Sequence, residues 1–363
     1  MTHTEQRNGN EPHNVHNTLL DQTPDTLTTL CASWNEPGFR AKQLLEWVYQ
    51  RNVDDYERMT NLSKSLRTRL TDALPILGSR IVARQESSDG VVKLLLEWRD
   101  GATTECVLIP DGLRQTACIS TQVGCPVGCV FCASGLGGLQ RQLTAGEVVE
   151  QVIRIRALCG GGHRLSNVVF MGLGEPLANY TTTVHALRTI NADWGLGIGA
   201  RKITVSTVGL PTQMRRLADE KMQVTLALSL HAPTDELRRE IIPWADRVSI
   251  QELTDACSYY FDRTGREITL EYILLGGLND SERQARLLAT VARRMRANIN
   301  LIAYNPVDGL PYRRPDDSSI NRFRDALQNR GVNTHLRRSR GIDIDAACGQ
   351  LRRNRIVKLG GST

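Results

Sequence analysis

The chain has 363 residues, of which 40% are hydrophobic and 23% are charged, an ordinary globular composition that allows one large domain and a smaller one. The net charge of +6 permits an acidic partner such as nucleic acid but does not establish one. No apolar run reaches the ~20 residues of a membrane helix and the N-terminus lacks an apolar signal segment, so we expect a cytoplasmic protein without membrane contact.

The N-terminal part of the chain changes from polar to helical near residue 20. Residues 1–20 are rich in His, Asn and Thr, and we expect them to form a disordered tail. Residues 21–77 show apolar side chains at helical spacing, as in FRAKQLLEWVYQ, and predict a helical accessory domain. Cations on a helix are often only a solvated face, but these can also follow the phosphates of an RNA: Arg40, Lys42, Arg51, Lys64, Arg67 and Arg69.

Three strand-like runs follow: SRIVARQ, GVVKLLLEW and TECVLIP. Asp-Gly pairs at Asp89-Gly90 and Asp100-Gly101 separate them, and such pairs are typical of tight turns between antiparallel strands. Residues 78–112 are therefore predicted to form a small strand-rich connector of β-hairpins.

Residues 113–348 alternate between strand-like and helical segments, from the strand TACIST to the helical SSINRFRDALQNR. Six such repeats with short connections predict an α/β fold whose core is a partial (β/α)6 barrel. The active site of such a fold lies at the carboxyl ends of the strands. Five motifs follow strands here: GCPVGCVFC, GLGEP, STVG, SLHAP and YNP. Residues 349–363 are expected to form a basic C-terminal tail.

Three of the nine cysteines, Cys125, Cys129 and Cys132, stand close together in a loop. In a reducing compartment, clustered cysteines more often bind metal or take part in catalysis than form disulfides. Three thiolates on one loop can hold three corners of a [4Fe–4S] cluster and leave one iron open. The alternative is a zinc site completed by a distant His or Cys, although the chain has no second close pair of cysteines.

This C-x-x-x-C-x-x-C loop after the first barrel strand resembles the radical S-adenosylmethionine superfamily. The resemblance implies a [4Fe–4S] cluster whose open iron binds S-adenosylmethionine, which is then cleaved reductively to a deoxyadenosyl radical. It also implies cofactor contacts for residues after the other strands, although each of them alone is typical of a loop or a helix cap: Gly174, Glu175, Ser206, Ser229, Leu230, His231 and Asn305.

A second informative stretch, SRGIDIDAACGQLRRNR, places Cys348 in a loop of small residues between arginines. Neighbouring cations favour the thiolate, which is the nucleophilic form, whereas most lone cysteines are simply buried small hydrophobes. Cys31, Cys159 and Cys257 lie in helical patterns and are expected to be such packing residues. The arginines around Cys348 are Arg337, Arg338, Arg340, Arg352, Arg353 and Arg355.

Together with ECVLIP, CISTQVGC, FMGLGEPLAN and SLHAP, this stretch is similar to the RlmN/Cfr family of RNA methyltransferases, over residues 39 to 355. The resemblance implies methylation of an adenosine with two molecules of S-adenosylmethionine per turnover. Cys348 takes a methyl group from the first, and the radical from the second removes a hydrogen from that methyl group. The methylene radical adds to the adenine ring, and Cys118 releases the product through a transient disulfide with Cys348. The resemblance implies that either Glu105 or Cys118 takes the ring proton. From the sequence pattern alone, Glu105 would be interpreted as a surface residue of a strand.

The chain most resembles the branch that methylates adenine C2, in 23S rRNA before ribosome assembly and in tRNA just 3′ of the anticodon. Methylation of C8, the activity of the antibiotic-resistance branch, stays open because FCASG resembles that branch's FCATG. A non-catalytic iron–sulfur or zinc protein that binds RNA or senses redox state is a third possibility, but it gives no purpose to Cys348 and Cys118. The chemistry also implies a reductase or flavodoxin-type electron donor, and we expect a monomer.

Overall fold

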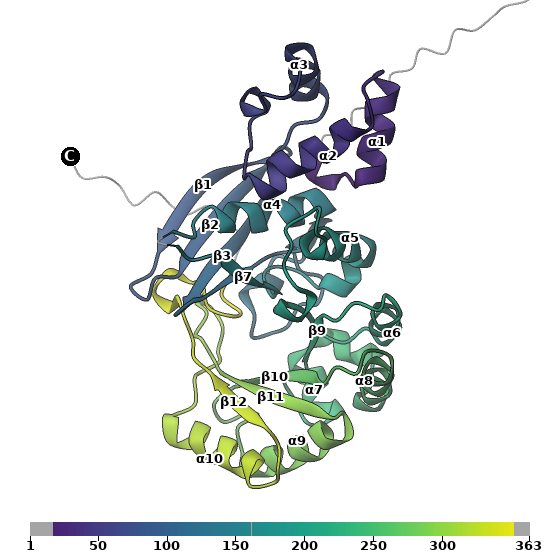
Figure 1. The fold of residues 1–363 in the computed structure, drawn as a ribbon. Coiled ribbons are helices and arrows are strands. Elements are labelled where there is room, and N and C mark those ends of the chain that lie inside the picture. Colours follow the sequence, from purple (N-terminus) through teal and green to yellow (C-terminus); the bar gives the residue numbers. More distant parts are fainter. Residues whose placement is uncertain (1–16, 161, 352–363) are drawn as a thin grey trace, which may run out of the picture.

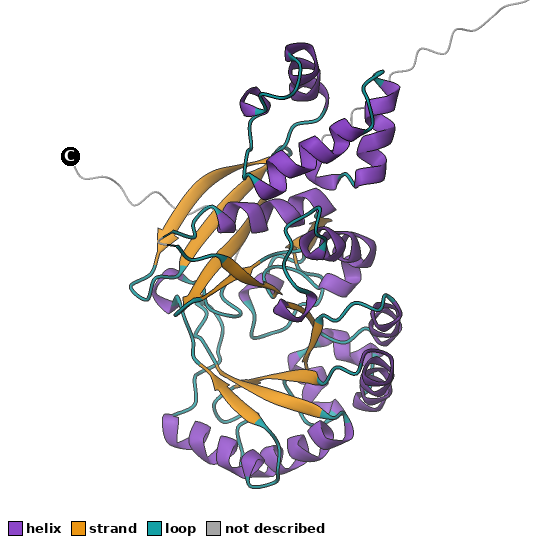
Figure 2. Cartoon of the chain, in the orientation of Figure 1, coloured by secondary structure: helices purple, strands orange, loops and turns teal. Residues whose placement is uncertain are grey.

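The computed structural model describes residues 17–160 and 162–351 (Figure 1). Its centre is a ten-stranded sheet in the order β1-β2-β3-β4-β7-β8-β9-β10-β11-β12. Every neighbouring pair from β4 to β12 is parallel. These strands curve into an open barrel with the helices on its outside (Figures 1 and 2). The predicted α/β fold with a partial parallel barrel is confirmed, and no described helix is long and apolar enough to cross a membrane.

The barrel strands alternate with helices along the chain. Several of these helices begin at a Ser or Thr whose side chain accepts a hydrogen bond from the backbone N–H three residues on, as at Thr144, Ser249 and Ser281. The elements are β4 (Arg114–Cys118), α4 (Ala145–Arg156), β7 (Leu165–Phe170), α5 (Tyr180–Asn191), β8 (Ile203–Thr207), α6 (Pro211–Asp219), β9 (Thr225–Ser229), α7 (Asp235–Ile241), α8 (Ile250–Thr264), β10 (Ile268–Leu274), α9 (Glu282–Arg294), β11 (Ala297–Ala303), α10 (Asp317–Gln328) and β12 (Thr334–Arg337).

The predicted connector strands form part of the same sheet. β1 (Ser79–Glu86), β2 (Val92–Trp98) and β3 (Thr103–Asp111) are antiparallel to one another, and β3 pairs antiparallel with β4. The Asp-Gly turns are present, with Gly90 and Gly101 at φ of 81° and 80°, a conformation that favours glycine. The connector therefore extends the sheet at the first strand of the barrel.

The helical accessory domain consists of α1 (Pro24–Ser33), α2 (Phe39–Leu45) with its continuation η2 (Glu46–Gln50), and α3 (Lys64–Ala73). The predicted disordered tail is too long at its end, because Leu19 and Leu20 are fully buried in the core. They begin the short helix η1 (Leu19–Asp21), whose Asp21 accepts a 2.6 Å hydrogen bond from the backbone N–H of Gly146. Two leucines in a polar stretch carry too little pattern to predict this, and residues 1–16 lie outside the described part.

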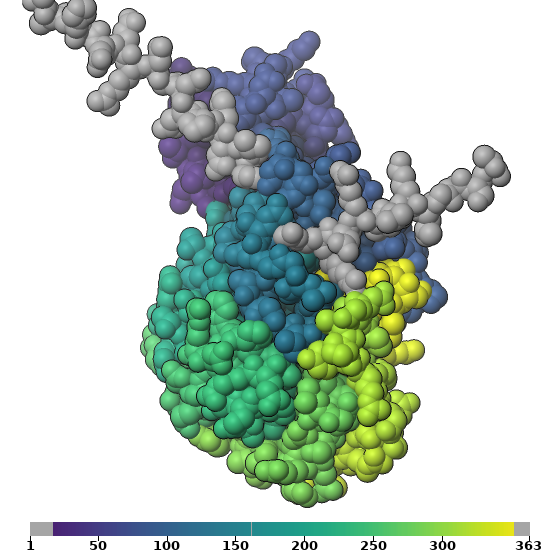
Figure 3. Space-filling view, turned by 180° about the vertical axis from the view of Figure 1, so that it is seen from behind, coloured from purple at the N-terminus to yellow at the C-terminus, as the bar shows by residue number. Residues whose placement is uncertain are grey.

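The far end of the chain also packs more than expected. Residues 339–351, here named the C-terminal loop, return to the connector, and Figure 3 shows this yellow segment beside the blue connector residues. Asp343 accepts hydrogen bonds from Ser87 and Ser88, and Asp89 accepts one from the N–H of Gly341. Gln350 and Leu351 are buried, so the predicted basic tail is wrong for its first residues, and positions 352–363 lie outside the described residues.

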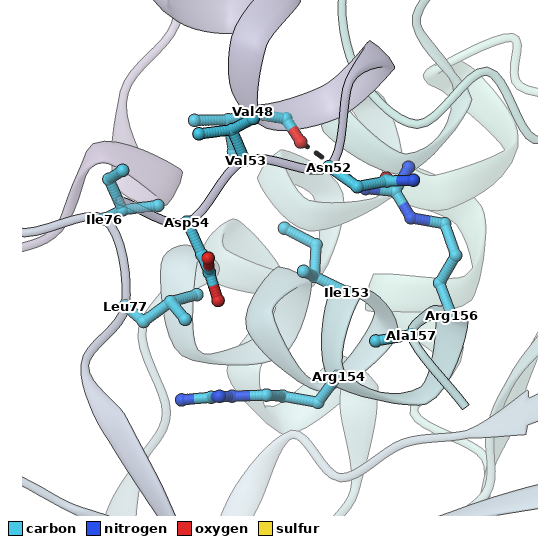
Figure 4. A pocket seen from close by; sticks show the side chains of 10 residues that line it. All are labelled: Val48, Asn52, Val53, Asp54, Ile76, Leu77, Ile153, Arg154, Arg156 and Ala157. Atoms are coloured by element: carbon cyan, nitrogen blue, oxygen red, sulfur yellow. Dashed lines mark hydrogen bonds between the residues drawn. The ribbon is translucent and has the colours of Figure 1, made fainter. Parts of the chain in front are cut away.

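Helix α4 joins the accessory domain to the barrel. Arg156 donates a 2.8 Å hydrogen bond to the carbonyl of Tyr49. Beside it lies a small pocket with mostly apolar walls, from Val48, Val53 and Ile76 on one side to Ile153 on the other (Figure 4). The accessory domain is thus docked on α4 through both apolar and polar contacts.

Glu150 on α4 positions the start of β1 through hydrogen bonds. Its fully buried carboxylate accepts hydrogen bonds from the N–H groups of Gly78 and Ser79 and pairs with Arg154 at 3.2 Å. Replacement by alanine leaves these part-buried donors and the guanidinium of Arg154 without their acceptor, so we expect Glu150→Ala to lower the free energy of unfolding by about 3 kcal/mol in urea denaturation. The control is Glu86→Ala, which removes an exposed ion pair with Arg84 and should change it by about 1 kcal/mol or less. Equal effects of the two replacements would contradict this role.

Candidate active site

The three clustered cysteines lie in a loop between β5 (Gln122–Gly124) and β6 (Leu139–Gln142), two short antiparallel strands. Backbone hydrogen bonds hold the loop, from Cys125 N–H to Gly138 and from Val130 N–H to Ile241, each 3.1 Å long. Cys125, Cys129 and Cys132 all line one cavity. The three cysteines, whose spacing predicts a shared site, therefore line the same cavity.

Burial raises the pKa of all three thiols, to about 12 for Cys125. Without a cation the loop thus holds neutral thiols, whereas a bound iron–sulfur core keeps them as thiolates. Among the described residues, no set of three or more His, Cys, Asp or Glu side chains is arranged to hold a single metal ion. The fit to a cluster therefore rests on three sulfur donors that face one cavity.

Other predicted residues come to the same cavity from different strands. Gly174 and Glu175 follow β7, Ser206 is the second-last residue of β8, and Ser229 ends β9 with His231 just beyond. The hydroxyl groups of Ser206 and Ser229 lie 3.3 Å apart. The expectation that the motifs after separate strands meet at one end of the barrel is met by these five residues.

Two predicted cofactor residues stand apart from this set. Leu230 is fully buried and does not line the cavity; its N–H donates to the carbonyl of Glu271. Asn305 lines an adjoining cavity of about 660 Å³, and its side-chain amide donates to the carbonyl of Cys348 at 3.3 Å. Leu230 thus supports the wall, while Asn305 positions the C-terminal loop.

Glu175 is held rigidly at the cavity wall. Its two carboxylate oxygens accept hydrogen bonds from the N–H groups of Leu177 and Val208, at 2.9 and 2.7 Å. Burial nevertheless raises its pKa to about 7. Gly174 before it has φ of 109°, and a Cβ there would lie 2.8 Å from the side chain of Gln122. A cationic ligand such as an ammonium group would favour the charged carboxylate at this point.

His231 is a structural residue of the wall. It has a positive φ of 58°, and its Nδ1 accepts a 3.1 Å hydrogen bond from the N–H of Ile273. Its ring packs edge-to-face on Phe131. Burial lowers the pKa of His231 to about 3, so the imidazole is neutral and does not act as an acid near neutral pH.

Cys348 lies where the two cavities meet. It lines both of them, as do Cys132, Met171 and Arg337. Cys348 is the main cause that raises the pKa of Arg337, which places the guanidinium charge beside this sulfur. The predicted cationic surroundings of Cys348 are therefore provided by an arginine at the end of β12.

Cys118 faces Cys348 across the second cavity. Both residues line it, and each thiol is within electrostatic reach of the other. Burial raises the pKa of Cys118 to about 12, so it is a neutral thiol near neutral pH. The two cysteines that the sequence resemblance pairs are thus brought together from β4 and from the C-terminal loop.

Glu105 is buried, not a surface strand residue. It lines neither cavity, but it faces the same side of the sheet as Val107, which pairs with Cys118. Its carboxylate forms a buried ion pair with Lys93 at 3.0 Å, and Lys93 also donates to the carbonyl of Asp345. Glu105 is therefore connected to the C-terminal loop three residues before Cys348.

The buried acidic residue Glu271 was not predicted from the sequence as part of the site. Glu271 on β10 is buried and lines both cavities; its Oε1 accepts from Asn300, while Oε2 has no hydrogen-bond partner in the described structure. The Oδ1 of Asn305 is likewise buried without a partner. Buried acceptors of this kind are expected where the donors of a ligand complete them. The available signal was a charged residue in the otherwise apolar strand ITLEYIL.

Two family models match the chain. The model described as Ribosomal RNA large subunit methyltransferase N-terminal domain matches residues 17–76, and that of the Radical SAM superfamily matches residues 119–288. The “Probable dual-specificity RNA methyltransferase RlmN” of Rhodopirellula baltica is 44% identical over 339 residues, which cover 93% of this chain and 91% of that protein. The chain belongs to the RlmN family.

Other relatives agree with this membership. The “Probable dual-specificity RNA methyltransferase RlmN 3” of Opitutus terrae is 47% identical over 350 residues, or 92% of this RlmN-family chain and 94% of that protein. The crystal structure of a radical SAM methyltransferase from Sphaerobacter thermophilus matches with a TM-score of 0.91 and 44% identity, over 93% of this chain and 100% of that one. This RlmN-family protein is a radical RNA methyltransferase that depends on S-adenosylmethionine, and its family implies a [4Fe–4S] cluster.

Proposed function

We propose that this enzyme methylates C2 of an adenosine in RNA through a methyl group carried on Cys348. The observation that carries the proposal is the place of Cys348, at the junction of the cysteine-lined cavity with a second cavity that holds Cys118. A methyl acceptor at this junction can meet the cofactor on one side and a target base on the other. The proposed substrates are 23S rRNA before assembly, in the peptidyl-transferase region, and tRNA just 3′ of the anticodon.

The proposed cofactor site uses the wall residues described above. Cys125, Cys129 and Cys132 would hold the cluster, and Glu175 would accept from the amino group of S-adenosylmethionine. When bound, two molecules of this cofactor per turnover supply a methyl group and then a radical that removes hydrogen from it. The other proposed cofactor contacts are Gly174, Ser206, Ser229, Leu230, His231 and Asn305.

The residues of the second cavity would do the rest of the chemistry. Arg337 holds a positive charge beside Cys348, the residue that would take the methyl group. After the methylene group has joined the adenine ring, the radical adduct would give up one electron and its ring proton. Cys118 would then lose its own proton and attack the sulfur of Cys348, which forms a transient disulfide and breaks the bond from that sulfur to the methylene carbon. This carbon takes up a proton and becomes the methyl group, and the electron donor would reduce the disulfide. The ring proton would go to Glu105 or to Cys118. A thiol with a pKa near 12 already holds its proton at neutral pH, and this favours Glu105, which forms an ion pair with Lys93.

The partners are further proposals. RNA would contact the accessory domain, whose family model is named for ribosomal RNA, and a reductase or flavodoxin-type protein would supply electrons to a monomeric, cytoplasmic enzyme. Several of the predicted RNA-binding cations also serve the domain itself. Arg51 and Arg69 stack on Trp47 and Trp34, and Arg67 pairs with Glu57. Their contribution to RNA binding would therefore come from positive charge on a rigid surface.

The product identifies the function. Anaerobically reconstituted enzyme is incubated with S-adenosylmethionine, a reductant and either protein-free rRNA or tRNA, and the digested nucleosides are compared with standards by mass spectrometry. We expect 2-methyladenosine in both RNAs and much less in assembled ribosomes. If the product is 8-methyladenosine, the enzyme uses the same radical chemistry but methylates C8 instead of C2. Cleavage of S-adenosylmethionine without RNA methylation would mean that neither RNA is the substrate, and no cleavage would favour a non-catalytic metal or redox protein.

A further inference from the structure

Arg238 on α7 is a buried cation without an anionic partner. It is the largest fully buried side chain among the described residues. Its Nη2 donates to the carbonyl of Val208 at 2.5 Å and its Nη1 to that of Val248 at 3.3 Å, while Nε has no acceptor. Within the described part of the chain, no carboxylate forms an ion pair with it. A charge removed from water in this way needs a compensating charge nearby.

The surroundings of Arg238 indicate which groups can supply the compensating negative charge. Helix α7 packs against the cysteine loop, because the carbonyl of Ile241 accepts a hydrogen bond from Val130, the neighbour of Cys129. The largest electrostatic partner of Arg238 is Cys129, ahead of Asp235 at the start of α7. The carboxylate of Asp235 is already an acceptor for the N–H of Ile250. The guanidinium therefore lies next to the cysteine loop, on the side where α7 packs against it.

Arg238 lines neither of the two cavities that hold the predicted site residues. A direct contact with S-adenosylmethionine or with RNA is thus not what keeps it charged and buried. His231, which is also close in electrostatic terms, is neutral and supplies no negative charge. Besides Asp235, the anions near Arg238 are the thiolates that a bound cluster would create in the loop.

We propose that Arg238 is the fixed counter-charge of the iron–sulfur cluster and raises its reduction potential. The inference rests on the proposed function, because it assumes that the three cysteines hold the cluster. Three thiolates outweigh the charge of the core, so the bound cluster is an anion. Reduction adds one electron from an external donor, without making or breaking a bond, and increases the negative charge. A buried cation therefore stabilises the reduced form more than the oxidised form.

Three substitutions separate charge from hydrogen bonding. Arg238→Gln and Arg238→Met remove the charge, and Gln keeps a donor amide, whereas Arg238→Lys keeps the charge. The matched control is Arg156→Gln, since Arg156 also donates to two backbone carbonyls but does so at the junction with the accessory domain. Iron and sulfide contents are measured after anaerobic reconstitution, and the folded state is checked by circular dichroism. The cluster is then titrated with dithionite while its reduced form is followed by electron paramagnetic resonance.

At the midpoint potential of the unmodified enzyme, we expect the ratio of reduced to oxidised cluster to fall at least tenfold in the Gln and Met variants, a shift of about 59 mV. The Lys variant and the Arg156→Gln control should keep the original midpoint. Loss of the cluster from folded Gln and Met variants, with the cluster retained by Lys, would also support the proposal.

The opposite results are equally distinct. An unchanged midpoint in Gln and Met variants that hold a full cluster would overturn the role of the charge. If all three variants, Lys included, lose the cluster or fail to fold, Arg238 only anchors the carbonyls of Val208 and Val248 and the proposal is wrong. Unmodified enzyme that binds no cluster would instead show that the proposed function itself has failed, before any variant is compared.

Discussion

Replacement of Cys348 by alanine should reduce RNA methylation by at least about a thousandfold, because the proposed carrier of the methyl group is then missing. Among the described cysteines, only Cys348 and Cys132 line both cavities, and Cys132 belongs to the cysteine loop. Cys348 is thus the one outside that loop, and it lies beside Arg337. Intact-protein mass spectrometry should find a methyl group on the unmodified enzyme after incubation with S-adenosylmethionine, and none on Cys348→Ala.

Cys118→Ala should fail in a different way. Cys348 would still accept the methyl group and join the adenine, but nothing would release it, so RNA should remain covalently attached to the protein on a denaturing gel. Cys106→Ala is the matched control, because Cys106 is equally buried in the neighbouring strand but packs into the main core, on the opposite face of the sheet from Cys118. Methylation at the original rate by Cys348→Ala would refute the methyl-carrier mechanism.

The barrel could be predicted because its elements have strong local patterns. Strands such as TLALS are apolar and buried on both faces at their centre, and several helices begin with a capping Ser or Thr. Helix α7 (DELRREI), although Thr234 caps it, and strand β12 (THLR) have no run of apolar residues. They are short and polar, and tertiary contacts determine them. Arg337 on β12 lines both cavities, and Arg238 on α7 lies next to the cysteine loop, so the short polar helix α7 hid a side chain that matters to the site.

The site was predicted to the extent that its residues lie in motifs along the chain. Cys125, Cys129 and Cys132 share one loop, and Glu175 stands in a glycine-rich turn after a strand. Glu271 and Arg238 carry no motif, because their importance comes from their burial and from one polar atom of each that has no partner in the described structure. Burial of this kind depends on which strands and helices become neighbours in the barrel, and a single sequence does not reveal it.

The second large effect should come from Cys129→Ala, which removes one of the three proposed cluster ligands. We expect the purified, reconstituted variant to lose nearly all iron and sulfide and to give no detectable cleavage of S-adenosylmethionine. Two remaining thiols cannot hold a cubane cluster at three corners, and burial keeps free thiols in this loop protonated, which further disfavours metal binding. Iron and sulfide analysis and an assay for deoxyadenosine test both expectations.

Cys257→Ala is the matched control for the loss of iron expected in Cys129→Ala. Cys257 is also fully buried, but it lies on α8 in the apolar core, so its loss should leave the cluster intact and change only packing. If Cys129→Ala keeps a full cluster, the loop is not the ligand set, and the same finding would remove the anion that Arg238 is proposed to balance. If only Cys129→Ala loses iron, Cys129 is a cluster ligand as proposed, and a loop with three cysteines can bind three of the four irons and leave the fourth open. That open position is where a chelating cofactor can bind, and it explains why Glu175 and the unpartnered oxygens of Glu271 and Asn305 line the cavities around it.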